Sequence, residues 1–516
     1  MTSMTLVHKL FLATALAGVP GIVAANTLSV QLSADIRSSQ PGINRDAITD
    51  SVVLNVVEGL VAAGEKGEIR PMLAESWTVT DEGKTYTFAL RKGVKFHNGE
   101  TMTSADVKFS LDKLLGNSEY NCKTFFDGSR DAKIASIEAP DAQTIVLKLD
   151  RPDAMLLNYM AQAQCGSTGI VHKSSYNEDG SWNRPVATGP FKFGEWKRGE
   201  SLTLTKFAAY AMAGDSIDGY GGRKQVMVDD VKLVVVPDAA TAVAGLRSGA
   251  LDILPYLPPG EAARLKEEKD FTLVAAPHGG LITMLFQTAD PLMSNVAMRR
   301  AVIAALDTPE IVNSVTYGLG VPNNSLVASG SFYHTAAHDK GYKYDPDAVK
   351  PLLTEAGYKG EKINIITNRR SAVNYDTAVI AQAMLQSAGI NAEIEVLEWA
   401  SQLDRFNSGK YQIMAFNYSN RPDPGLAYRT VVGAKAKRVN SIWDDAAVDK
   451  LVDQSLQEAD PARRQAIFDD LHTRFLDQVP FVMLANGLDV GISGPRIKGY
   501  STWQGFARFW GVERSE

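Results

Sequence analysis

The feature that most constrains the fold is a strand–helix–strand pattern over residues 231–254. VKLVVV (231–236) is a near-continuous run of apolar, mostly β-branched residues, as in a strand that is buried on both faces of a sheet. PDAATAVAGLRSG (237–249) has the spacing of a helix that is closed by its glycine, and LDIL (251–254) follows as a second strand. Two strands joined through a helix form the unit of a parallel sheet, so the pattern predicts an α/β protein.

The rest of the chain predicts more than one domain, because 516 residues are too many for a single hydrophobic core. Helical patterns dominate the second half and alternate with strands at 362–367, 392–399 and 411–418. A long helix over 460–478 begins at an Asp-Pro pair, and the apolar segment 481–492 could rejoin the earlier sheet. We therefore expect a mixed lobe, an α/β lobe, and a return to the first lobe at the end.

Residues 1–25 have the pattern of an export signal. His8 and Lys9 precede an apolar run that is too short to span a bilayer, and small residues end at Ala25. We expect cleavage near Ala25 and a soluble, exported mature protein; an uncleaved N-terminal helix is the alternative. The formal charge of −6, with no basic stripe, argues against nucleic acid and anionic membranes as partners.

The chain has two cysteines, Cys122 and Cys165, and their expected state depends on export to an oxidising compartment. In an oxidising environment two cysteines form a disulfide more often than a metal or catalytic pair. We therefore predict that they are bonded.

Catalytic motifs are scarce in the sequence. No GxSxG, HExxH, P-loop or GxGxxG pattern occurs. His334 and His338 have the spacing of a helical metal pair, but their surroundings have the composition of a loop, so a solvated loop pair is favoured. We expect no catalytic residues, no metal site and no cofactor.

The loop FNYSNRPDPG (416–425) is the sharpest local signal. Two prolines restrict the backbone around Arg421 and Asp423, so we expect the two charged side chains to project in similar directions. In α/β sheets such side chains at the carboxyl end of a strand face the ligand crevice. The alternative is an ordinary surface loop, which has the same composition.

Two further segments carry open alternatives. The glycines of HGG (278–280) allow a close approach by another strand or by a ligand. Trp399, expected at the end of the strand 392–399, is either a core edge or a face on which a ligand stacks.

The stretch 71–111 resembles the extracellular solute-binding proteins of ABC importers, family 5, the dipeptide, oligopeptide and nickel group. It contains LAESW (73–77), a DxGKxYxFxLR pattern (81–91), VxFHxG (94–99) and TxxDV (103–107). The similarity continues in order through nearly the whole mature chain, including ATGPFKF (187–193). Many motifs in the same order are a specific signal, whereas any one alone would be weak.

The resemblance implies a two-lobed periplasmic-binding-protein fold (type II, flytrap) with an extra subdomain in the first lobe. The implied boundaries are a signal peptide at 1–25, a first lobe at 26–258 plus 481–516, and a second lobe at 259–480. The extra subdomain would span about 55–185.

The resemblance also implies ligand contacts. In the peptide binders an aspartate after the corresponding strand captures the α-ammonium of the peptide, which makes Asp423 the leading candidate. Arg421 departs from a simple peptide site, because a guanidinium there could offset the aspartate or grip a carboxylate or phosphate. The further candidates are Asn417, Ser419, Trp399, His278, Asn44, Arg45, Gln164 and Ser167.

The function implied is a monomeric periplasmic receptor that passes a small polar ligand to the permease subunits of an ABC importer. The ligand would be a short peptide, or an opine or sugar-phosphate conjugate. Nickel and heme are less favoured, since no histidine cluster is evident. The alternatives are a ligand-sensing or chaperone-like protein on the same fold and, with less support, an exported hydrolase.

Overall fold

The computed structural model describes residues 26–129, 131–421 and 423–515. The predicted export signal at 1–25 and Pro422 of the 416–425 loop lie outside the described residues. Within the described ranges, no helix has the length and apolar character needed to cross a membrane.

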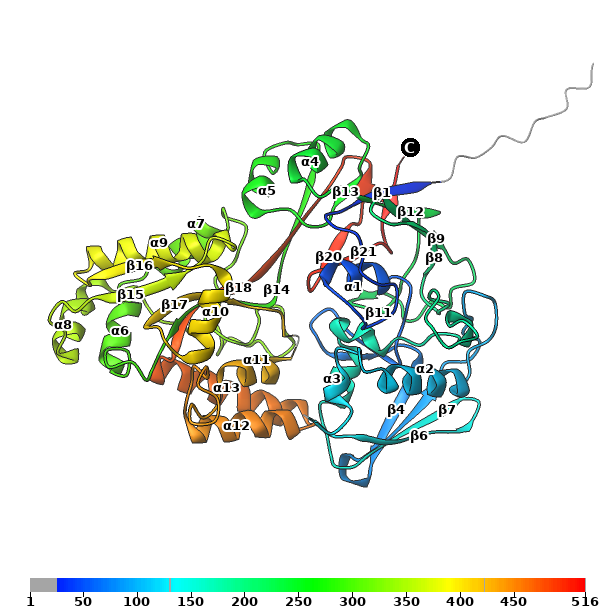
Figure 1. Ribbon diagram of the computed structural model, residues 1–516, viewed down its shortest axis with the longest axis horizontal. Helices are drawn as coiled ribbons and strands as arrows, with labels where there is room; N and C mark the ends of the chain where they lie inside the picture. The colour runs from blue at the N-terminus through cyan, green and yellow to red at the C-terminus, as the bar shows by residue number, and fades with distance from the viewer. Residues whose placement is uncertain (1–25, 130, 422, 516) are drawn as a thin grey trace, which may run out of the picture.

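A ten-stranded mixed sheet extends through both lobes of the molecule (Figure 1). Two long antiparallel strands, β14 and β18, lie at its centre and carry the sheet from one lobe to the other. The α/β class and the two-lobed fold are therefore confirmed. The strand order is β16 (Ala392–Val396), β15 (Ile363–Thr367), β17 (Ile413–Tyr418), β14 (Thr272–Phe286), β18 (Phe481–Ser493), β13 (Ile253–Leu254), β1 (Thr27–Leu32), β12 (Asp230–Val235), β9 (Ser201–Lys206) and β8 (Phe191–Lys197).

The predicted parallel unit is present, since β12 and β13 both pair in parallel with β1, and α4 (Ala239–Ser248) joins them. The expectation that this strand is buried on both faces is wrong. Val231 and Leu233 are fully buried, but Lys232 is exposed and Val234 is half-buried. On the face of Lys232, the neighbouring Val234 and Val236 are only partly buried against the cluster that contains α4.

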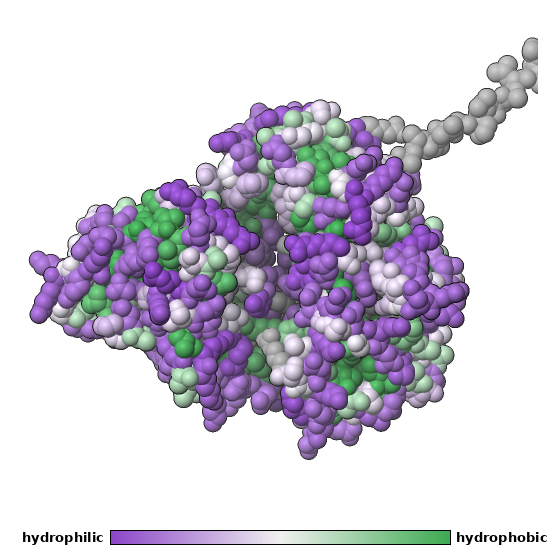
Figure 2. Space-filling view, in the orientation of Figure 1, coloured by the Kyte–Doolittle hydropathy of each residue, from purple (hydrophilic) through white to green (hydrophobic). Residues whose placement is uncertain are grey.

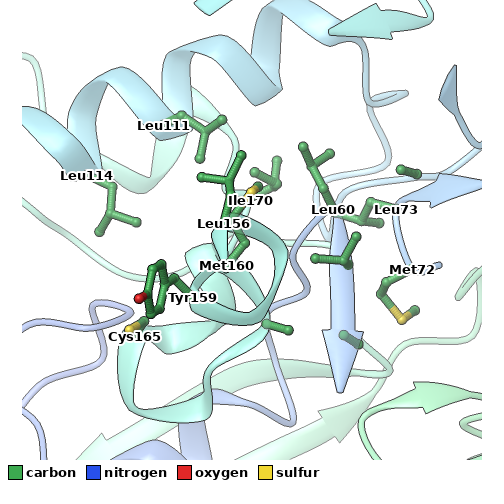
Figure 3. Close-up of a cluster of buried hydrophobic side chains, with 14 of the residues drawn as sticks. Leu60, Met72, Leu73, Leu111, Leu114, Leu156, Tyr159, Met160, Cys165 and Ile170 are labelled. Atoms are coloured by element: carbon green, nitrogen blue, oxygen red, sulfur yellow. The ribbon is translucent and has the colours of Figure 1, made fainter. Parts of the chain in front are cut away.

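The first lobe holds a smaller four-stranded antiparallel sheet in the order β4 (Ala74–Thr80), β5 (Thr85–Leu90), β7 (Thr144–Leu149) and β6 (Ile134–Asp141). Two helices, α2 (Ser104–Gly116) and α3 (Leu156–Ala161), pack beside it. In Figure 3, Leu111 of α2 points towards Leu156 of α3 and Leu114 towards Tyr159 of α3, within the core of this subdomain. In the structure Cys122 and Cys165 form a disulfide, and both residues belong to the same core.

The second lobe is largely helical, and the chain then returns to the first lobe. As predicted, α13 (Pro461–Gln478) begins after the N-cap Asp460, and β18 rejoins the large sheet beside β13. The remaining helices are α1 (Ala47–Val53), α5 (Pro259–Leu265), α6 (Val296–Ala304), α7 (Thr308–Val315), α8 (Pro346–Ala356), α9 (Ala372–Ser387), α10 (Trp399–Ser408), α11 (Pro424–Val431) and α12 (Ala446–Gln457).

Candidate functional site

A cavity of about 950 Å³ opens between the two lobes and contains residues from both in its wall. Figure 2 shows the hollow between the two bodies of the molecule. The strands that connect the lobes contribute His278 from β14 and Asp489 from β18. The cavity is therefore placed where a movement of the lobes would change its shape.

Arginines form the most prominent polar group in the wall. The first lobe contributes Arg45, which lies just before α1; the second lobe contributes Arg421, Arg429 and Arg438. The Nε of Arg45 donates to Asp50 at 2.6 Å. Burial raises the pKa of the Asp50 carboxyl to about 6, and the hydrogen bond from Arg45 opposes that rise only in part.

Arg429 and Arg438 of the second lobe are hydrogen-bonded to neighbouring groups of their own lobe. Arg429 of α11 donates to Asp449 at 2.6 Å and also to Asp453, both on α12. Arg438 donates to the hydroxyl of Ser441 at 2.9 Å and to the carbonyl of Val432 at 2.8 Å. Partial desolvation lowers the pKa of Arg438 although the residue is exposed, and the positive charge of Arg429 lowers it further, while Tyr418 and Asp449 act in the opposite direction. An anion in the cavity would relieve this repulsion.

The connecting strands bring His278 and Asp489 together, with Nε2 and Oδ1 3.8 Å apart. Burial raises the pKa of Asp489, and the charge of His278 opposes the rise. The glycine opposite on β18, Gly487, makes room for the imidazole, because a Cβ there would lie 2.0 Å from His278 Cε1.

The glycines at 279 and 280 resolve one of the alternatives left open by the sequence. A Cβ on Gly279 would lie 2.4 Å from Asn420 Oδ1, and one on Gly280 would lie 3.0 Å from Tyr418 O. The structure thus brings the end of β17 and its loop against these glycines. This contact holds the backbone of Arg421 beside Gly279.

Amides form a second polar group in the wall, namely Asn121, Gln162, Gln164, Asn420 and Gln504. Asn420 Nδ2 donates to Gln504 Oε1 at 2.9 Å, and Gly279 N donates to the same oxygen at 3.3 Å. Three rings, those of Phe125, Tyr256 and Phe506, complete the surface. Such a wall can hydrogen-bond hydroxyls and acidic groups and still cover an apolar edge of a ligand.

Asp423, the leading candidate from the sequence, does not line this cavity. Its carboxylate is 3% exposed and receives two hydrogen bonds from Arg464, at 2.7 and 2.8 Å. It also accepts from Gly425 N at 2.8 Å, as the N-cap of α11. The expectation that Arg421 and Asp423 project in similar directions is wrong, because capping the helix turns the carboxylate into the protein.

The structure separates the other predicted residues into two groups. Arg45, Gln164, His278, Ser419 and Arg421 line the cavity. The others lie elsewhere in the fold: Asn44 is exposed, Ser167 is buried in a tight turn, Asn417 directs its amide to Ser371 Oγ at 3.5 Å, and Trp399 packs on Phe416.

Trp399 also corrects an element boundary. The strand β16 ends at Val396, and Trp399 is the first residue of α10 rather than the end of the strand. Its ring stacks on that of Phe416, with centroids 6.0 Å apart. Of the two alternatives, the structure supports the core edge.

Sequence reasoning missed Arg429, Arg438 and Asp489. A usable signal existed for Arg429, because Asp423-Pro424 marks the start of a helix on which Leu426, Arg429 and Thr430 share one face. For Arg438 and Asp489 no local pattern points to a cavity.

His334 and His338 do not form the solvated pair that the sequence favours. His338 is fully buried, and its ring lies 5.2 Å from that of His472 on α13. Within the described ranges, no group of three or more His, Cys, Asp or Glu is arranged to hold a metal ion.

Comparison with known proteins gives consistent results. A family model described as bacterial extracellular solute-binding proteins, family 5 Middle, matches residues 68–438. The dipeptide-binding protein of Escherichia coli K12 is 25% identical over 460 residues, covering 84% of each chain.

Solved structures resemble the whole fold. HbpA2 from Haemophilus parasuis aligns with a TM-score of 0.81 at 23% identity, over 95% of this chain and all of the other. The binding protein AgaA in complex with agropinic acid, from A. tumefaciens R10, aligns with a TM-score of 0.67 at 27% identity, over 95% of this chain and 99% of the other.

Proposed function

This chain belongs to the bacterial extracellular solute-binding proteins of family 5, and from that membership we propose that it is the solute-binding receptor of an ABC importer. It is exported by residues 1–25, cleaved near Ala25, and works as a periplasmic monomer with its Cys122–Cys165 pair oxidised. It captures a small polar solute and delivers it to the permease subunits. The similarity to a dipeptide-binding protein and to an agropinic acid complex supports a short peptide or an opine-like conjugate as the solute class.

The observation that carries the proposal is the cavity between the lobes. Its wall combines arginines, amides and aromatic rings from both lobes around about 950 Å³. Closure would remove these polar groups from water, so a ligand that fails to pair with them would leave buried donors unsatisfied. Selection by complementary hydrogen bonding needs no catalytic group.

The connecting strands supply a place for the lobes to bend. The pairing of β14 with β18 shifts register between His278 and Leu281, next to Gly279 and Gly280. An irregularity of this kind weakens the ladder locally and allows a change in strand direction. We assign the hinge of the closing motion to this point.

Thermal unfolding of the mature chain, residues 26–516, tests the proposal. A panel of short peptides, opines, sugar acids and sugar phosphates is screened for a rise in Tm. A ligand at 100 times its Kd stabilises the folded state by about 2.7 kcal/mol, which raises Tm by a few degrees. If no solute in the panel shifts Tm, the receptor function is contradicted.

A further inference from the structure

The charge of the cavity wall defines the solute class more narrowly, on the premise that the proposed receptor function holds. We propose that the cavity selects a small hydroxylated anion carrying at least two acidic groups, carboxylate or phosphate, and excludes the α-ammonium of a free peptide. Two groups of charged side chains support this class of ligand. One group faces the cavity, and the other is already paired with opposite charges inside the protein.

Among the described residues of the wall, four are arginines and one, Asp489, is a carboxylate. The acids that hold Arg45 and Arg429, namely Asp50 on one side and Asp449 and Asp453 on the other, are not part of the wall. A solute in the cavity can therefore contact the guanidinium groups directly, whereas the aspartates that pair with them lie behind the wall. Guanidinium forks bind carboxylate and phosphate oxygens in pairs.

Arg438 is the arginine of the wall whose contacts most clearly favour a bound anion. The hydrogen bonds of its guanidinium go to neutral groups, the Ser441 hydroxyl and the carbonyls of Arg429 and Val432. The positive charge of its neighbour Arg429 acts on it, and the opposing effect of Asp449 is smaller. An acidic group between Arg429 and Arg438 would offset both charges at once. This pair therefore forms one anion subsite, and Arg45 in the facing lobe forms a second.

The carboxylate that a peptide ammonium would need is already in use. Both oxygens of Asp423 accept from Arg464, and both side chains are almost fully buried. The remaining carboxylate of the wall, Asp489, is close to His278 at 3.8 Å. An ammonium in the cavity would meet four guanidinium groups against this single carboxylate, so the net charge of the wall is unfavourable to it.

The amides of the wall extend the description of the ligand. Gln162 and Gln164 lie in the wall on the side of the first lobe, and Asn420 and Gln504 meet across the two lobes. An amide both donates and accepts hydrogen bonds, which suits hydroxyl groups. Sugar acids and phosphorylated sugars carry both kinds of group.

Isothermal titration of the mature chain tests the proposal with four probes: glucarate, fructose 1,6-bisphosphate, glucose and the dipeptide Ala-Ala. We expect at least one of the two anions to bind, and its affinity to fall as salt is raised, because exposed charges are screened. Glucose and Ala-Ala should not bind. Comparing glucarate with fructose 1,6-bisphosphate, each with two acidic groups, shows whether carboxylate or phosphate is preferred.

Two variants locate the binding. Arg438→Gln in one subsite and Arg45→Gln in the other should each weaken binding of the anion at least tenfold. The matched control is Arg247→Gln, whose exposed guanidinium pairs with Glu268 and lies outside the cavity, and it should bind as the parent does. Unchanged binding in both cavity variants would overturn the proposal.

The remaining outcomes separate this proposal from the receptor function. Binding of Ala-Ala or glucose as tight as that of the anions overturns the anion class but leaves a solute receptor. Failure of both anions to bind also overturns it. Only the failure of the whole panel in the thermal screen contradicts the receptor function itself.

Discussion

Arg421 and Asp423 stand two residues apart in the chain but have opposite roles in the fold. Arg421 lines the cavity between the lobes, whereas Asp423 is buried and paired with Arg464. The comparison shows that a charge near a binding site is informative only once its partner is known. A carboxylate bound by an internal guanidinium stabilises the protein, and an arginine at a cavity wall is placed to meet a ligand.

The two sites also differ in how they depend on solvent. The Asp423–Arg464 pair is 3% and 6% exposed at its side chains, so loss of one partner leaves a charge without water or a counter-ion. The guanidinium groups at the cavity are partly or fully exposed to solvent. The first site should therefore respond to substitution in stability and the second in affinity.

The largest expected effect is on the buried pair. Arg464→Met should lower the free energy of unfolding by about 3–5 kcal/mol, because the carboxylate of Asp423 stays buried without its partner. Urea denaturation measures the change. The neighbouring Arg463→Met, which removes an exposed pair with Glu458, should cost far less. Equal losses in the two variants would contradict the assignment.

The next effect concerns Asp50 behind the cavity arginine Arg45. Its pKa is raised from 3.8 to about 6 in the folded state, so the native protein binds more protons between these values. The resulting contribution to stability is present below pH 3.8 and is lost as pH rises through about 6. Arg45 and Asp46 are the charged groups that act on it.

The test is the difference in unfolding free energy between the parent and Asp50→Asn. On moving from pH 7.5 to pH 4.5, this difference should shift in favour of the parent by roughly 2 kcal/mol. Burial lowers the pKa values of His97 and His338 to about 4, which reduces stability over the same range, but equally in both proteins. A difference that stays constant with pH would show that Asp50 is ionised throughout.

A smaller effect is expected at the contact between β14 and the loop that carries Arg421. Gly279→Ala places a Cβ 2.4 Å from Asn420 Oδ1 and 2.6 Å from Arg421 O, so the loop must move. We expect a loss of about 1–3 kcal/mol in stability, together with weaker solute binding. At Gly330 an added Cβ meets nothing within 4 Å, so Gly330→Ala is the control. Unaltered binding in Gly279→Ala would show that the position of this loop is not critical.

The smallest effect concerns the link between the lobes at Asp423. Asn158 of α3 donates to Asp423 Oδ2 at 3.2 Å, beside the stronger bonds from Arg464. Asn158→Ala should therefore cost only about 0.5–1.5 kcal/mol in thermal or urea unfolding. A loss as large as that in Arg464→Met would mean that Asn158 contributes much more to satisfying the carboxylate than the geometry indicates.

Much of the fold could be predicted because its signals are local. The parallel unit around α4, the helix α13 with its Asp-Pro start, and the return of β18 all follow from short patterns. The burial of β12 could not be judged in this way, because the exposure of Lys232 depends on which elements the fold packs against that face of the sheet.

For the site, the sequence by itself determined the family and the segments that approach the cleft. Five of the ten predicted ligand contacts line the cavity, among them Arg45, His278 and Arg421. Only the tertiary structure decided which charges face it. Arg464 lies 41 residues after Asp423, and Arg438 and Asp489 reach the cavity from separate elements. The pairing of charges depends on distances across the fold, which no local pattern encodes.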